Sequence, residues 1–191
     1  MRLFVAAEIG ERLADRAVEL IRELQKRTAD VAPHARLAWL APNRLHITIR
    51  FIGEVDDVGA AAIVAALQSP LSVSPFDLTL VGVGAFPNSG PPRVVWTGIE
   101  QGRDDLMALE REVSSRLTTL AIPSEGRPYS PHLTLARVRE AAGLRSSSLL
   151  EGLDDRSLGT TRIDTTTLFQ SRLSPKGPTY VPLLRTPLRA G

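Results

Sequence analysis

The sequence contains no cysteine, which excludes disulfide bonds, thiolate metal sites and cysteine nucleophiles. Its 191 residues also lack any apolar run close to the roughly 20 residues that a membrane-spanning helix needs. The first stretch, MRLFVAAEIGERL, has neither the charged start nor the long apolar centre of a signal peptide. These absences predict a cytoplasmic protein with no membrane partner, and we expect a monomer.

Lysine is almost absent, because Lys26 and Lys176 are the only two among 23 basic residues. Arginine stays protonated far above neutral pH, which explains a pI near 9.5 beside a formal net charge of only +2. Arginine also favours bidentate contacts with phosphate. Since the net charge is small, overall charge is weak evidence for a nucleic-acid partner.

Histidine is scarce as well, with His34, His46 and His132 the only three. Two of them stand in the same pattern, His-x-Thr-x with an aliphatic residue at each x, over residues 46–49 and 132–135. His34 follows Pro33 outside any motif, and we expect it to be an exposed loop residue without a catalytic role.

The composition, 43% apolar and 23% charged, is that of an ordinary globular protein. Hydrophobic periodicity predicts helices over residues 11 to about 28, 56–67 and 103–120. Strands are predicted over residues 3–7, 36–40, 45–52, 76–83, 93–99, 132–138, 162–170 and 179–184. No linker is long or biased enough to separate domains, so residues 1–191 are expected to form one domain.

The two halves of the chain share a similar order of elements, with one histidine motif in each. We therefore expect an α+β fold of two duplicated lobes, each of β-α-β-β type, with antiparallel sheets facing a central cleft. A pseudo-twofold axis would bring both motifs to that cleft. The spacing does not prove a duplication, but duplication is the simplest explanation of it.

Each motif places a threonine on the same strand face as its histidine, because side chains two residues apart lie about 6–7 Å apart on one face. In the first motif, alternation predicts one face with Leu45, Ile47, Ile49 and Phe51, and the opposite face with His46, Thr48 and Arg50. A single such motif is more often structural than catalytic. Two copies in comparable places favour a function.

Two histidines and two threonines suit the opening of a cyclic phosphodiester by water. The reaction needs a base for the proton of water and an acid for the departing ribose oxygen, and imidazole serves in both roles near neutral pH. Two facing strands can place the imidazoles on opposite sides of the phosphorus. Threonine hydroxyls can donate hydrogen bonds to the non-bridging oxygens, where negative charge is held. This chemistry requires no metal and no other cofactor.

These paired motifs resemble those of the 2H phosphoesterase superfamily, and within it the RNA 2',3'-cyclic phosphodiesterases, historically called 2'-5' RNA ligases. The resemblance extends over nearly the whole chain and is carried by residues 1–6, 39, 42–55, 82–88, 93–96, 127–137 and 171–180. Two positions depart from it. Arg50 stands where relatives often carry a small or different residue, and Ser174 stands where threonine is frequent.

The resemblance implies a bilobal α+β hydrolase that opens 2',3'-cyclic phosphate ends of RNA to 2'-phosphomonoesters. It implies that His46 is the proton donor to the leaving 3'-oxygen, that His132 is the base, and that Thr48 and Thr134 hold the phosphate. The choice of acid and base rests on the resemblance alone, since the two motifs are locally alike. Fragments of tRNA and small cyclic nucleotides are candidate substrates.

Other residues near the motifs carry weaker hypotheses. Arg127 and Arg137 flank the second motif; Arg127 is either an RNA phosphate contact or an exposed structural residue. Phe4, Trp39, Phe86 and Tyr129 are candidates for stacking on bases, with core packing favoured for Phe4 and Trp96. Tyr180 is open between packing and substrate contact, and Lys176 and Gly177 are expected to form a plain turn.

Two alternatives stay open. The same site could join RNA ends through a 2'-5' linkage, because acid and base exchange roles in the reverse direction. The chain could instead be a non-catalytic RNA- or nucleotide-binding module, whose histidines only contact phosphate. A metal hydrolase is disfavoured, because no acidic residue stands beside either histidine within its strand.

Overall fold

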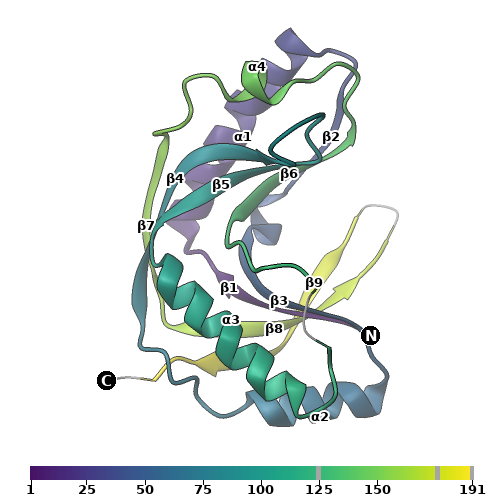
Figure 1. Ribbon diagram of the computed structural model, residues 1–191, viewed down its shortest axis with the longest axis vertical. Helices are drawn as coiled ribbons and strands as arrows, with labels where there is room; N and C mark the ends of the chain where they lie inside the picture. Colours follow the sequence, from purple (N-terminus) through teal and green to yellow (C-terminus); the bar gives the residue numbers. More distant parts are fainter. Residues whose placement is uncertain (124–125, 175–176, 190–191) are drawn as a thin grey trace.

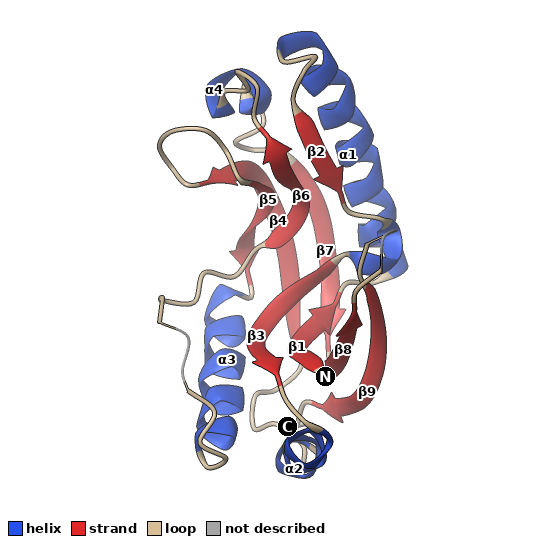
Figure 2. Cartoon of the chain, turned by 90° about the vertical axis from the view of Figure 1, so that its right-hand side faces the viewer, coloured by secondary structure: helices blue, strands red, loops and turns tan. Residues whose placement is uncertain are grey.

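The computed structural model describes residues 1–123, 126–174 and 177–189 (Figures 1 and 2). Its elements are β1 (Arg2–Glu8), α1 (Glu11–Val31), β2 (Arg36–Trp39), the 3-10 turn η1 (Pro42–Arg44), β3 (His46–Glu54), α2 (Asp57–Leu67), β4 (Phe76–Phe86), β5 (Val94–Gln101), α3 (Arg103–Thr118), β6 (Leu133–Glu140), α4 (Ser146–Leu150), β7 (Ser157–Ile163), β8 (Thr165–Arg172) and β9 (Thr179–Pro187). The three predicted helices are confirmed. The short helix α4 was not predicted, because five residues are too few to show a helical period. The strand expected over residues 162–170 is divided at Asp164 into β7 and β8.

All nine strands of the described residues belong to one antiparallel sheet in the order β7-β4-β5-β6-β3-β1-β8-β9, with β2 also paired to β6. Its two halves meet between β6 and β3, where Ile47 and Leu133 are paired. The α+β prediction is confirmed, and the two expected sheets prove to be halves of one curled sheet.

Strands β3 and β6 separate immediately after this pair, because β2 occupies the next part of the edge of β6. The amide of Leu40 donates to the carbonyl of Leu135 at 2.9 Å, and Trp39 is paired with Ala136. The two halves of the sheet therefore splay apart from the point where both histidine motifs begin (Figure 2).

The helices cross between the halves (Figure 1). Helix α1 follows β1 but packs against β7 and α4 of the other half, and α3 follows β5 but packs against β3. Arg16 and Arg27 of α1 donate to the carbonyls of Leu158 and Leu149, both at 3.2 Å. Each half of the sheet thus buries its apolar face under a helix that the other half supplies.

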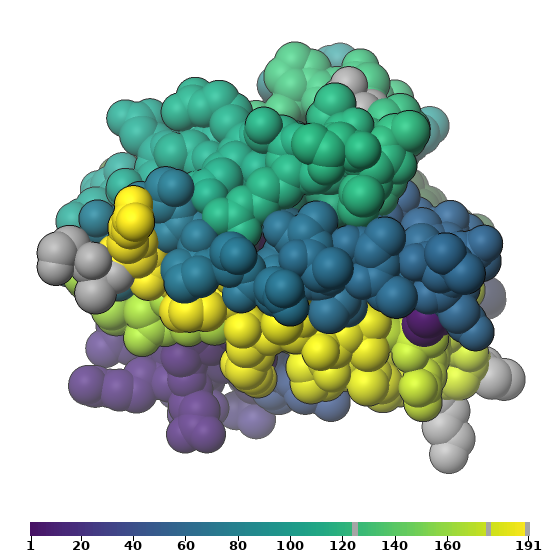
Figure 3. Space-filling view, turned by 90° about the horizontal axis from the view of Figure 1, so that it is seen from below, coloured from purple at the N-terminus to yellow at the C-terminus, as the bar shows by residue number. Residues whose placement is uncertain are grey.

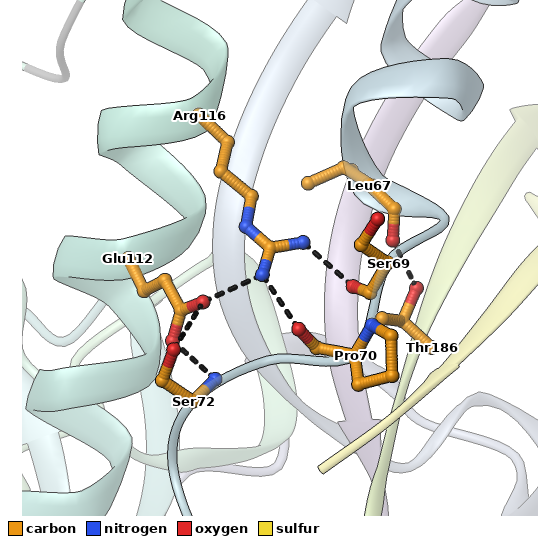
Figure 4. A network of polar contacts seen from close by, with 7 residues as sticks. All are labelled: Leu67, Ser69, Pro70, Ser72, Glu112, Arg116 and Thr186. Carbon is orange, nitrogen blue, oxygen red and sulfur yellow. Dashed lines mark hydrogen bonds and ion pairs between the residues drawn. The ribbon is translucent and has the colours of Figure 1, made fainter. Parts of the chain in front are cut away.

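The end of α2 is held to α3 by a network of polar contacts (Figure 4). Arg116 donates to the carbonyls of Ser69 and Pro70, both at 2.7 Å, and pairs with Glu112 at 2.7 Å. Glu112 accepts a hydrogen bond from the amide of Ser72 at 2.8 Å. These contacts pair backbone groups of the loop that follows α2, and α2 and α3 lie side by side (Figure 3).

The two faces of the sheet carry different hydrophobic clusters. On the helix side, the main core includes Leu3, Val5, Ile47 and Leu133. On the other side, a small separate cluster consists of Phe4, Ala6 and Phe169, with Tyr180 packed against it. The second cluster lies on the face to which His46 belongs.

The expected alternation along β3 is wrong beyond Ile49. A β-bulge shifts the register, so that Thr48 is paired with Ala6 but Arg50 with Val5. One extra residue turns the following side chains to the opposite face, until a second register shift between Phe51 and Gly53. Arg50 is therefore on the core side and only 2% exposed, with Nη2 donating to the carbonyl of Pro123, whereas Phe51 is 46% exposed on the face of His46.

Candidate active site

The two motif histidines are anchored in the same way. Nδ1 of His46 lies 2.8 Å from the carbonyl oxygen of Arg44, and Nδ1 of His132 lies 2.7 Å from that of Ser130. A carbonyl can only accept, so each Nδ1 carries the hydrogen. In the neutral imidazole, Nε2 then holds the lone pair and is the nitrogen left for chemistry.

The pair between Ile47 and Leu133 brings the motifs together. Both side chains are fully buried on the helix side of the sheet. The four residues that flank them in the sequence project from the opposite face of the sheet. These four side chains are all half-buried: His46, Thr48, His132 and Thr134. In an antiparallel register, the residues on either side of this pair are also opposite one another. His46 is therefore opposite Thr134, and Thr48 is opposite His132.

Aromatic rings support both imidazoles. The ring of His46 lies 5.0 Å from that of Phe4 and 5.2 Å from that of Tyr180, the second contact being edge-on. The ring of His132 lies 5.2 Å from that of Phe86, also edge-on, and 6.3 Å from that of Trp96. Phe4 thus packs in a buried cluster as expected, whereas Trp96 is half-buried outside both hydrophobic clusters and contacts His132.

Gly84 makes the position of Trp96 possible. The two residues are paired between β4 and β5, and a Cβ atom on Gly84 would lie 2.3 Å from the indole ring. The ring therefore occupies the space that a side chain would fill. It also contacts Phe86 at 4.9 Å, so that both rings beside His132 support each other.

Burial dominates the electrostatics of the site. The pKa of His46 is lowered to about 4, mainly by burial and in smaller part by the charge of Arg137. The hydrogen bond to the carbonyl of Arg44 and the charge of Glu8 raise this pKa but do not offset the lowering. Burial also lowers the pKa of His132, against the bond to Ser130, and Arg137 again adds to the lowering. Both imidazoles are therefore neutral at pH 7 in the free protein. Arg137 lowers the pKa of both imidazoles, which shows that it lies near both of them.

The remaining predicted residues occupy different places. Arg137 is exposed on β6. Arg127 is exposed too, but it lines a cavity of about 360 Å³ on the helix side, between α3 and β3. The hydroxyl of Tyr129 donates to the carbonyl of Thr48 at 2.9 Å, and its ring packs against the main core. Tyr129 thus connects the loop before the second motif to the strand of the first motif.

Three minor predictions can be placed as well. His34 is exposed in a turn, as expected, and Trp39 is half-buried on β2. Ser174 donates its hydroxyl to the carbonyl of Gly177 at 2.7 Å and so closes the turn between β8 and β9. Lys176 lies outside the described residues.

Sequence reasoning missed Glu8, the last residue of β1. It is paired with His46 across the β1–β3 ladder and forms an ion pair with Arg185 at 2.5 Å. No motif surrounds Glu8, and its partner comes from the other end of the chain. Only the strand order brings them together.

Two features are absent from the described parts of the chain. No group of three or more histidine, aspartate or glutamate side chains is placed so that it could hold a metal ion. None of the described helices combines the length and the apolar character needed to cross a membrane.

The chain is similar in sequence to a known protein family and to several of its members. Residues 10–173 match the family model of the 2'-5' RNA ligase superfamily. An RNA 2',3'-cyclic phosphodiesterase of Archaeoglobus fulgidus is 33% identical over 94% of this chain and 96% of its own. One of Aeropyrum pernix is 39% identical over 71% of this chain and 77% of its own.

Solved structures are similar over the full length. TT0787 of Thermus thermophilus superposes with a TM-score of 0.76 at 28% identity, over 100% of this chain and 99% of its own. E. coli LigT in complex with 3'-AMP superposes with a TM-score of 0.74 at 25% identity, over 98% and 97%. The curled sheet is thus shared with these proteins.

Proposed function

Because the chain belongs to the 2'-5' RNA ligase superfamily, we propose that it hydrolyses 2',3'-cyclic phosphate ends of RNA to 2'-phosphomonoester ends. The proposed mechanism is acid–base catalysis by His46 and His132 without a metal. Its relatives from A. fulgidus and A. pernix carry the name of this activity. E. coli LigT has been crystallised with 3'-AMP, a ligand of the size of one nucleotide.

One observation carries the proposal: two imidazoles, each with Nδ1 held by a backbone carbonyl, flank the Ile47–Leu133 pair on one face of the sheet. This arrangement leaves two Nε2 atoms for one substrate. A base and an acid of this kind each contribute about 10²–10⁴ in rate.

Two proton transfers accompany the proposed hydrolysis. Water loses a proton to Nε2 of His132 while its oxygen bonds to phosphorus. The bond from phosphorus to the ribose 3'-oxygen breaks, and Nε2 of His46 gives its proton to that oxygen. The 2'-oxygen keeps the phosphate. Proton exchange with solvent then returns both histidines to their first state.

The phosphate would be held by three side chains. The hydroxyls of Thr48 and Thr134 donate to the non-bridging oxygens. Arg137 acts on both imidazoles and so supplies positive charge near the same point. A bound anion also favours the protonated form of His46, which the free protein disfavours. Arg127, on the helix side, would contact RNA farther from the cyclic end.

The test uses an oligonucleotide with a 2',3'-cyclic phosphate, first alone and then with a 5'-hydroxyl acceptor strand. We expect a 2'-phosphate by ³¹P NMR, unchanged by a chelator, with only traces of joined product. His46→Ala and His132→Ala should bind the oligonucleotide but lose turnover. A 3'-phosphate product, or binding without turnover in the parent protein, would refute the proposal. Joining as the main reaction would identify the ligase alternative.

A further inference from the structure

The two halves of the site differ in charge although their backbone arrangement is alike. Among the described residues, Glu8 is the one carboxylate that acts on the pKa of either motif histidine, and it acts on His46. It stands directly opposite His46 in the ladder between β1 and β3. Residues that are directly opposite on antiparallel strands project from the same face.

The equivalent position of the other half cannot hold a carboxylate. Strand β5 pairs with β6 as β1 pairs with β3, and Thr97 is opposite Leu133. One further step along this register sets Gly98 opposite His132. A Cβ atom on Gly98 would lie 2.9 Å from the carbonyl oxygen of Val81, which is too close for a side chain without a backbone shift.

Glu8 is held in place by two partners on the C-terminal strands. Its Oε2 accepts a hydrogen bond from the hydroxyl of Thr167 at 2.8 Å. Arg185 contacts both carboxylate oxygens, at 2.5 and 3.3 Å. The carboxylate is therefore fixed in direction, although 40% of the Glu8 side chain is exposed.

The other charged or titratable groups facing His46 come from different strands. Arg137 on β6 opposes its protonation, His132 stands on the same face, and Tyr180 of β9 contacts the ring edge-on. A carboxylate near an imidazole favours the imidazolium form. Glu8 thus supplies a bias toward protonation on one side of the site alone.

We propose that Glu8 is a positioning residue that favours the proton on His46, in opposition to burial and Arg137, and thereby supports His46 in the role of the acid. This inference rests on the proposed function. It gives a physical reason for an asymmetry that the two locally identical motifs do not contain.

The test is an NMR titration of the imidazoles in the free protein, where three histidines give few signals. Single substitutions of each histidine assign them, and circular dichroism verifies the fold at each pH. Glu8→Gln removes the charge and should lower the pKa of His46 by about half a unit. Arg185→Gln leaves Glu8 without its counter-ion and should raise that pKa. His132 should move less in both variants.

The two variants break the same ion pair but are expected to act in opposite directions. Shifts of His46 in the same direction, or no shift in either variant, would overturn the proposal in favour of a structural role. Activity gives a second readout. A pKa lower by half a unit reduces the protonated fraction about threefold, so Glu8→Gln should lower kcat about threefold for a 3'-oxygen leaving group.

A substrate with sulfur in place of the 3'-oxygen needs little help from an acid, and its kcat should be unchanged by Glu8→Gln. An equal loss for both substrates would overturn the proposal. The titration needs no substrate, so the two proposals fail separately. Opposite shifts of His46 in a protein without phosphodiesterase activity would refute the proposed function alone.

Discussion

The hydroxyl of Tyr129 donates a hydrogen bond to the backbone carbonyl of Thr48 at 2.9 Å, which ties the loop before the second motif to the strand of the first. The bond ends on the residue next to Ile47, whose pair with Leu133 joins the two halves of the sheet. It therefore helps to set the distance between two halves of the site that a single residue pair joins.

Replacing Tyr129 by phenylalanine should weaken this connection. The change keeps the ring in the core but removes the donor, and a bond of this kind contributes about 1 kcal/mol. We expect a free energy of unfolding in urea lower by about that amount, and a kcat lower by several-fold at nearly unchanged KM. An unchanged kcat together with the lower stability would show that the tether does not position the motifs.

The acid and the base can be separated by the leaving group. We expect His46→Ala and His132→Ala each to lower kcat by about 10²–10⁴ on the 3'-oxygen substrate. With sulfur at the 3' position, the loss in His46→Ala should largely disappear, because a thiolate leaves without a proton. The loss in His132→Ala should persist. Rescue of His132→Ala instead would reverse the roles, and His34→Ala is the control that should keep full activity.

Stability should fall in acid because of His46. Its pKa is about 4 in the folded protein and near 6.5 in the unfolded chain, so the unfolded chain binds more protons between these values. The contribution is complete above pH 6.5 and is lost as the pH falls toward 4. The loss amounts to about 1 kcal/mol per pH unit, at most a few in total.

Urea unfolding at pH 7 and pH 5 measures this effect. His46→Gln cannot take up the proton, so the difference in its free energy of unfolding between these pH values should be smaller than in the parent. His34→Gln provides the matched control, because His34 is exposed in a turn. An identical pH dependence in His46→Gln and the parent would contradict the prediction.

Gly84→Ala should displace the indole of Trp96. The added methyl would lie 2.3 Å from the ring, and such overpacking costs about 1–3 kcal/mol. Because Trp96 supports the ring of His132, kcat should fall as well. Gly126→Ala is the control, since its methyl group would meet no atom of the described residues within 4 Å. Thermal unfolding and kcat of both variants give the comparison, and equal behaviour of the two would refute this role of Trp96.

The sequence was sufficient for the local features of this protein. A period of two residues defined the strands of both motifs, and apolar residues at helical spacing defined the three long helices. The repeated His-x-Thr-x pattern identified both histidines, because histidine is rare here and its chemistry is specific. These signals lie in neighbouring residues, where backbone geometry alone relates one side chain to the next.

Tertiary structure decided what depends on register and strand order. The bulge opposite Val5 turned Arg50 into the core and Phe51 out of it, against a simple alternation. Helices α1 and α3 cross to the opposite halves. Glu8 lies beside His46 and Arg185 only because the sheet places β1 between β3 on one side and β8 and β9 on the other. Such contacts join residues far apart in the chain, and local periodicity holds no information about which strands become neighbours.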